Sequence, residues 1–179
     1  MSHSQWEKKK YKKAASEGKT SKLYTKLVRL IMVEAKKAGG NRESPGVKSA
    51  IAKARQYDMP VDNIERAIKK ASEPAVAMES ITYEAYGPGG VGIIIDALTE
   101  NRNKAAQEIK HILSKHGFPL AGIGSVSWGF KRIPTEEGLV WNAETTLELS
   151  DEDSALLDTL IEDLEENDEV QDVYTNKSI

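Results

Sequence analysis

The chain has 179 residues, 39% of them hydrophobic and 30% charged, which is typical of a soluble globular protein large enough to bury a core. No apolar run approaches the length of about 20 residues that a membrane-spanning helix needs, and no apolar signal core follows the N-terminus. We therefore expect a cytoplasmic protein with no membrane partner. The absence of cysteine excludes disulfides and thiolate metal sites.

The net charge of −3 conceals two halves of opposite sign. Residues 1–78 carry 18 Lys and Arg against 8 Asp and Glu, whereas residues 79–179 carry 7 against 20. The first half has a net charge of +10 and the second of −13. This split indicates a polyanionic partner for the basic half, although two solvated faces would give the same totals.

Residues 1–18 form a basic arm in which aromatic side chains lie among the lysines. Such a pattern suits phosphates and unstacked bases, while a solubilising tail is the simpler alternative. The residues of the arm that we expect to contact nucleic acid are Trp6, Lys8, Lys9, Lys10, Tyr11, Lys12 and Lys13.

Residues 19–73 predict a domain of three helices. Apolar residues at helical spacing predict the first helix at Lys19–Ala38, Ser44 caps a second that begins at Pro45, and the third covers Asp62–Ala71. Basic side chains follow the same helices on other faces, where they could neutralise several phosphates. These candidate nucleic-acid contacts are Lys19, Lys22, Lys26, Arg29, Lys36, Lys53, Arg55, Arg66, Lys69 and Lys70.

Residues 83–117 predict a strand, a tight turn, a second strand and a helix. Pro88 suits the second position of a type I or II turn, and Gly89 supplies the positive φ that a type II turn requires at the third. Asn101 or Thr99 can cap the helix, and Gly117 is placed to end it in the left-handed conformation. A hairpin packed on a helix is the nucleus of an α+β domain.

The rest of the second half completes that domain, which we place at residues 79–179. We expect strands at Ser125–Lys131 and Leu139–Leu149, an acidic helix capped by Ser150, and a last strand near Val170–Tyr174. The apolar positions of the acidic helix are Leu156, Leu157, Leu160, Ile161 and Leu164. The predicted fold class is α+β: a three-helix domain, then a mostly antiparallel sheet with two helices.

Catalysis has little support in the sequence. The loop Gly87–Gly90 lacks the Gly-Lys-Ser/Thr ending of a phosphate-binding P-loop and joins two strands. His111 and His116 are five residues apart, roughly 140° around a helix, so they cannot share a metal. We therefore expect no enzymatic activity, no metal and no cofactor.

Four segments together resemble the YebC/PmpR family. They are Tyr-Gly-Pro-Gly-Gly at 86–90, Asn-Arg-Asn at 101–103, Ser-Lys-His-Gly at 114–117 and Gly-Ser-Val-Ser-Trp at 124–128. Family members usually insert a ferredoxin-like unit after the strand at Gly124–Phe130, whereas here a short connector at about 131–138 follows. The chain thus resembles a short form of the family, without the inserted domain.

The resemblance implies a non-enzymatic regulator of gene expression. Some members are described as DNA-binding transcriptional regulators and others as ribosome-associated translation factors. No base-reading pattern is apparent in the basic half, so we favour ribosomal RNA or the ribosome as the partner, with DNA as the alternative. A protein-interaction module that acts through the acidic C-terminal half is a further alternative.

One polar segment allows two interpretations. Asn101, Arg102 and Asn103 could cap the helix and leave an arginine on the surface, or they could form a phosphate contact at a helix N-terminus.

Overall fold

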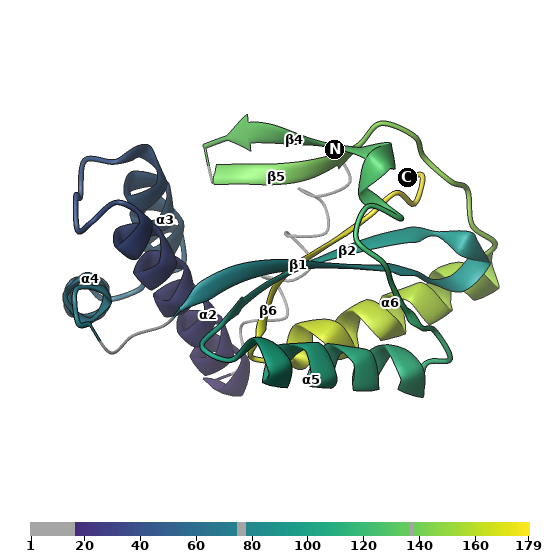
Figure 1. The fold of residues 1–179 in the computed structure, drawn as a ribbon, viewed down its shortest axis with the longest axis horizontal. Coiled ribbons are helices and arrows are strands. Elements are labelled where there is room, and N and C mark those ends of the chain that lie inside the picture. The colour runs from purple at the N-terminus through teal and green to yellow at the C-terminus, as the bar shows by residue number, and fades with distance from the viewer. Residues whose placement is uncertain (1–16, 75–77, 137) are drawn as a thin grey trace.

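The computed structural model describes residues 17–74, 78–136 and 138–179, with side chains from residue 21 onward (Figure 1). The candidate nucleic-acid contacts in residues 6–13 lie outside the described residues, and so does the side chain of Lys19. The helices are α2 (Glu17–Lys37), α3 (Pro45–Gln56), α4 (Val61–Ala71), α5 (Arg102–Lys115) and α6 (Asp151–Glu166). The strands are β1 (Glu79–Tyr86), β2 (Gly92–Thr99), β3 (Leu120–Ala121), β4 (Phe130–Thr135), β5 (Gly138–Ala143) and β6 (Val170–Thr175).

The three N-terminal helices pack around one hydrophobic cluster, because α2 lies against both α3 and α4. Fully buried members of the cluster include Leu27, Ile31, Val47 and Ile64. Ser44 caps α3 as predicted, since its hydroxyl accepts a hydrogen bond from the amide of Val47. Leu98 of the second half also belongs to this cluster, so the helices are packed onto the sheet.

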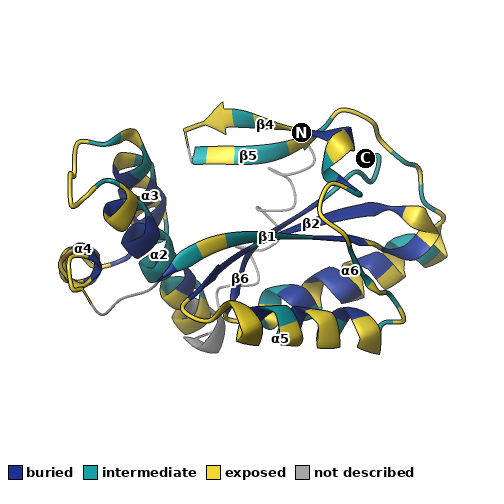
Figure 2. Ribbon diagram, in the orientation of Figure 1, coloured by how far each residue is buried: buried dark blue, intermediate teal, exposed yellow. Residues whose placement is uncertain are grey.

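The second half contains a four-stranded sheet in the order β3-β1-β2-β6, in which every pairing is antiparallel. Helices α5 and α6 cover one face of the sheet and bury a second cluster that includes Ile93, Ile95, Ile109, Leu113 and Leu160 (Figure 2). The hairpin formed by β4 and β5 covers part of the other face. The predicted α+β fold, with a three-helix region before a mostly antiparallel sheet and two helices, is confirmed.

The turn between β1 and β2 has the predicted backbone. Gly89 has a φ of 66°, and the amide of Gly90 donates to the carbonyl of Gly87 at 3.0 Å. A side chain at position 89 would meet Leu149 at 2.7 Å, so the turn needs glycine for space as well as for conformation.

Helix α5 begins and ends as predicted. The Asn101 side chain accepts a hydrogen bond from the amide of Lys104 at 3.1 Å, which makes Asn101 the N-cap. Gly117 follows the helix with a φ of 86°.

Three sequence predictions are wrong in detail. The segment predicted to begin a strand at Ser125 forms turns through Gly129, because the carboxylate of Glu84 accepts the backbone amides of Val126 and Ser127. The strand predicted to reach Leu149 ends at Ala143. Leu156, predicted to be a core position of α6, is 52% exposed.

Candidate nucleic-acid interface

Three basic side chains of α2 point to the C-terminal end of α6. Lys22 lies 2.6 Å from the carboxylate of Glu166 and 3.1 Å from its carbonyl oxygen, while Lys26 donates to the carbonyl of Glu165. Arg29 donates to the carbonyl oxygens of Leu98 and Asp168 at 3.1 and 3.0 Å. We call Lys22, Lys26 and Arg29 the α2 clamp.

The α2 clamp complements the chemistry of a helix end. The last carbonyls of a helix have no partner within the helix and carry the negative end of its dipole, so cations are favoured there. Arg29 also lies 3.3 Å from the Glu169 carboxylate, whose other oxygen receives Lys104 of α5 at 3.1 Å. Arg29 and Lys104 therefore join α2 and α5 through one buried acid, which lies between α6 and β6.

The environment of Glu169 favours its charged form. Burial is the largest influence and acts to raise its pKa, but hydrogen bonds from Thr99 and Lys104 and the charge of Arg29 outweigh it. The pKa of Glu169 is therefore lowered, although its side chain is only 4% exposed.

We predicted that Lys22, Lys26 and Arg29 contact nucleic acid, and the structure gives each of them a partner within the chain. Lys26 is 5% exposed, and Arg29 is engaged by backbone carbonyls, so neither faces a partner outside the molecule. The helical spacing was predicted correctly, but the anion opposite it is the end of α6.

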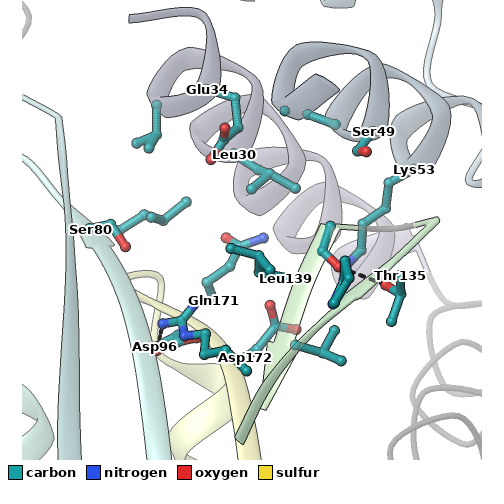
Figure 3. Close-up of a pocket in the computed structure, with 18 of the residues that line it drawn as sticks. Leu30, Glu34, Ser49, Lys53, Ser80, Asp96, Thr135, Leu139, Gln171 and Asp172 are labelled. Carbon is teal, nitrogen blue, oxygen red and sulfur yellow. Dashed lines mark hydrogen bonds and ion pairs between the residues drawn. The ribbon is translucent and has the colours of Figure 1, made fainter. Parts of the chain in front are cut away.

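Lys53 also lies away from the outer surface. It is 8% exposed and lines a cleft of about 420 Å³ between the N-terminal helices, the sheet and the β4–β5 hairpin (Figure 3). The cleft is also lined by the carboxylates of Glu34, Asp96 and Asp172 and by the cations Lys37 and Arg132, so it carries charges of both signs. Burial raises the pKa of Asp96, despite its hydrogen bond from Thr82.

The remaining predicted cations gather on α3 and α4. Arg55, Arg66, Lys69 and Lys70 are all exposed, and Figure 2 shows much of α4 as exposed surface. Arg66 donates to groups of its own helix. Arg55, Lys69 and Lys70 form no ion pair with any residue that the structure describes. Lys36, on α2, is exposed as well.

One member of this surface, Arg42, was not among the predicted contacts. Arg42, in the loop before α3, makes a two-point contact with Glu65 of α4 at 2.8 and 2.6 Å. The pKa of Glu65 is lowered mainly by its hydrogen bond from Arg42, and the charge of nearby Arg55 acts in the same direction. We call Arg42, Arg55, Arg66, Lys69 and Lys70 the α3–α4 basic surface.

The segment Asn101–Asn103 has structural contacts. Asn101 caps α5, and Arg102 lies 3.6 Å from the carboxylate of Glu79. Both contacts fit the helix-capping interpretation, and all three side chains are exposed at the start of α5.

The described residues contain no group of three or more His, Asp or Glu side chains that could hold a metal ion. None of the helices within the described ranges has an apolar stretch long enough to cross a membrane.

Two family models together match most of the chain. Residues 4–74 match the TACO1/YebC protein N-terminal domain, and residues 78–137 and 132–177 match the TACO1/YebC second and third domain. The two pieces of the second match meet in the β4–β5 hairpin, where the sequence predicted a connector in place of the inserted unit.

Similar proteins agree with these matches. A "Probable transcriptional regulatory protein" of Fervidobacterium nodosum is 44% identical over 94% of this chain and 67% of its own length, and one of Pseudothermotoga lettingae is 39% identical over 97% and 69%. A crystal structure of a conserved hypothetical protein from Aquifex aeolicus has a TM-score of 0.82 at 28% identity, covering 91% of this chain and 92% of that one. The chain belongs to the TACO1/YebC family, whose similar members are named as probable regulators of gene expression.

Proposed function

We propose that this protein regulates gene expression by binding nucleic acid through the α3–α4 basic surface. One observation supports this choice above the rest of the basic half. Arg55, Lys69 and Lys70 are exposed and form no ion pair with a described residue, whereas the α2 clamp is occupied by α6. Exposed cations without an ion pair can displace the counterions condensed on a nucleic acid, whereas the cations of the α2 clamp would first have to give up their contacts with α6.

The proposed contact is largely independent of base sequence. The exposed side chains of this surface are mainly Lys and Arg, and no helix carries the pattern of Asn, Gln and Arg that reads base edges. The protein would then recognise the position and shape of phosphates, without catalysing a reaction.

We favour ribosomal RNA over long duplex DNA as the partner. The basic surface lies on α3 and α4 at one end of the molecule, and the half with a net charge of −13 extends away from it (Figure 1). A long uniform duplex would lie along both ends of the protein, and the acidic end would repel it. A bounded RNA site would contact the basic end alone.

The first experiment measures the affinity for a structured RNA fragment as a function of salt. If three to five phosphates are neutralised, the log–log slope should be roughly −2 to −4. Affinity that does not change with salt would contradict the electrostatic contact.

A DNA-binding transcriptional regulator is the second candidate. The relatives favour it, because they are named probable transcriptional regulatory proteins. Co-sedimentation with ribosomes at near-physiological salt should be compared with binding to promoter fragments and to random duplex. We expect ribosome association and little preference among duplexes. A protein that stays off ribosomes, yet prefers one promoter about a hundredfold over random duplex, would establish the transcriptional role instead.

A further inference from the structure

Three large apolar side chains are exposed on the loop from β3 to β4 and at the end of β1, which the Tyr86–Ser125 hydrogen bond brings together. Figure 1 shows α3 and α4 at the other end of the molecule. Ile123 is fully exposed, Trp128 is 71% exposed and Tyr86 is 43% exposed. Ile123 and Trp128 flank Ser125 in the sequence, and the Ser125 carbonyl accepts the Tyr86 hydroxyl. Single exposed apolar residues are ordinary, but several gathered about one loop are typical of a site of interaction. We call Tyr86, Ile123 and Trp128 the aromatic patch.

Hydrogen bonds hold the patch in one conformation. The carbonyl of Ser125 accepts both the Tyr86 hydroxyl and the Trp128 indole N–H, the latter at 2.9 Å. The buried carboxylate of Glu84 accepts the amides of Val126 and Ser127, each at 3.3 Å. A loop fixed in this way loses little conformational entropy when a partner binds, so the patch is organised before binding.

The two segments that build the patch contain no charged residue. Residues 85–95 and 117–130 are both free of Asp, Glu, Lys and Arg, in a chain with 30% charged residues. Depletion of charge together with exposed Trp and Tyr is typical of the centre of a protein–protein interface. A nucleic acid would find no cation within these segments to neutralise a phosphate.

The border of the patch is mainly acidic. The amide of Glu144 donates to the carbonyl of Gly129, which places this exposed acid beside the loop. On the other side, Asp153 in the first turn of α6 lies against Gly89 of the β1–β2 turn. The basic residues near this border are Lys131 and Arg132, which follow the loop in the sequence, and Lys177, which donates to Ser154 of α6.

We infer that the aromatic patch binds a protein whose surface offers an apolar pocket surrounded by basic residues. The pocket would receive Ile123 and Trp128, and the basic residues would face Glu144 and the first turn of α6. The proposed function places nucleic acid at the opposite end, so the chain would join a nucleic acid to a protein component of the expression machinery. This inference goes beyond the proposed function and can fail separately from it.

The test places a photoreactive residue, p-benzoylphenylalanine, at position 123 of the full chain. Purified bacterial 70S ribosomes and purified RNA polymerase serve as the two probes, and the same residue at position 156 is the matched control, because Leu156 is also apolar and 52% exposed. We expect a cross-link from position 123, but not from position 156, to one polypeptide of one probe.

Two variants connect that cross-link to the patch. The polypeptide that is cross-linked should be purified and its affinity for each variant measured. It should bind the Ile123→Asp variant about tenfold more weakly than the unchanged chain, and it should bind the Leu156→Asp variant with unchanged affinity. Ile123→Asp should keep its affinity for RNA and its melting temperature, since the side chain is fully exposed.

Four outcomes would overturn the inference. They are a cross-link to nucleic acid that nuclease removes, a cross-link to a second copy of this chain, a cross-link within one chain, and a yield at position 123 no greater than at position 156. Equal binding of the polypeptide by Ile123→Asp would also contradict it.

Discussion

The α2 clamp and the α3–α4 basic surface carry the same kinds of side chain, yet they differ in what lies opposite. Lys22, Lys26 and Arg29 meet carbonyls and carboxylates at the end of α6, whereas Lys69 and Lys70 face solvent. Cations that meet an internal anion stabilise the fold, and cations left exposed are available to an external one. The difference separates the basic half into a structural part and the part that we propose binds nucleic acid.

Removing Arg29 should have the largest effect on stability. Arg29→Ala removes the hydrogen bonds that Arg29 donates to the Leu98 and Asp168 carbonyls, and it takes one cation from buried Glu169. The free energy of unfolding should therefore fall by about 2–4 kcal/mol. Denaturant unfolding measures this change. The control Arg55→Ala, on the exposed surface, should stay within about 0.5 kcal/mol. Equal losses for the two variants would remove the distinction between the two regions.

Acid should weaken the contacts of the α2 clamp through Glu169. The pKa of Glu169 is lowered in the folded protein, so the group stabilises the fold above its unfolded pKa of about 4.3, and this stability is lost as the pH falls through the folded pKa. Unfolding of the unchanged chain and of Glu169→Gln should be followed from pH 6 to 2, a range chosen to span about 4.3.

Glu169→Gln should be less stable near pH 6 and should lose less stability over that range. An identical acid dependence in both chains would show that Glu169 is not stabilised in its charged form.

The smallest effect belongs to the outermost member of the α2 clamp. Lys22 and Glu166 are 2.6 Å apart, but their side chains are 45% and 57% exposed, so solvent screens the pair. A double-mutant cycle with Lys22→Ala and Glu166→Ala should give a coupling energy of about 0.2–1 kcal/mol. A coupling as large as the effect of Arg29→Ala would mean that the pair is buried in solution.

Local chemistry allowed much of the fold to be predicted. Ser44, Asn101 and Ser150 cap their helices, and Gly89 and Gly117 adopt positive φ, because each requirement depends on neighbours within a few residues. The apolar spacing of α2 and α5 likewise identified their buried faces. These features follow from residue types and short distances along the chain.

The partners of the basic residues could not be predicted in that way. Lys22 and Glu166 are 144 positions apart, and no periodicity in α2 indicates whether its cations meet an internal anion. The wrong strand at Ser125 has a similar cause, because Glu84, 42 positions before Val126, holds that backbone in a turn. Arg42 was missed because its contact with α4 depends on how the loop before α3 folds back.

The most direct test compares RNA binding by two charge-reversed chains at equal salt. The variant with Lys69→Glu and Lys70→Glu should bind a structured RNA fragment about tenfold more weakly, with a salt slope smaller by roughly 1.5, because two phosphate contacts are lost. Lys22→Glu reverses a partly exposed cation of the α2 clamp and should change affinity less than about twofold. If Lys22→Glu abolishes binding while the double variant binds normally, nucleic acid meets α2, and the assignment of the two regions is wrong.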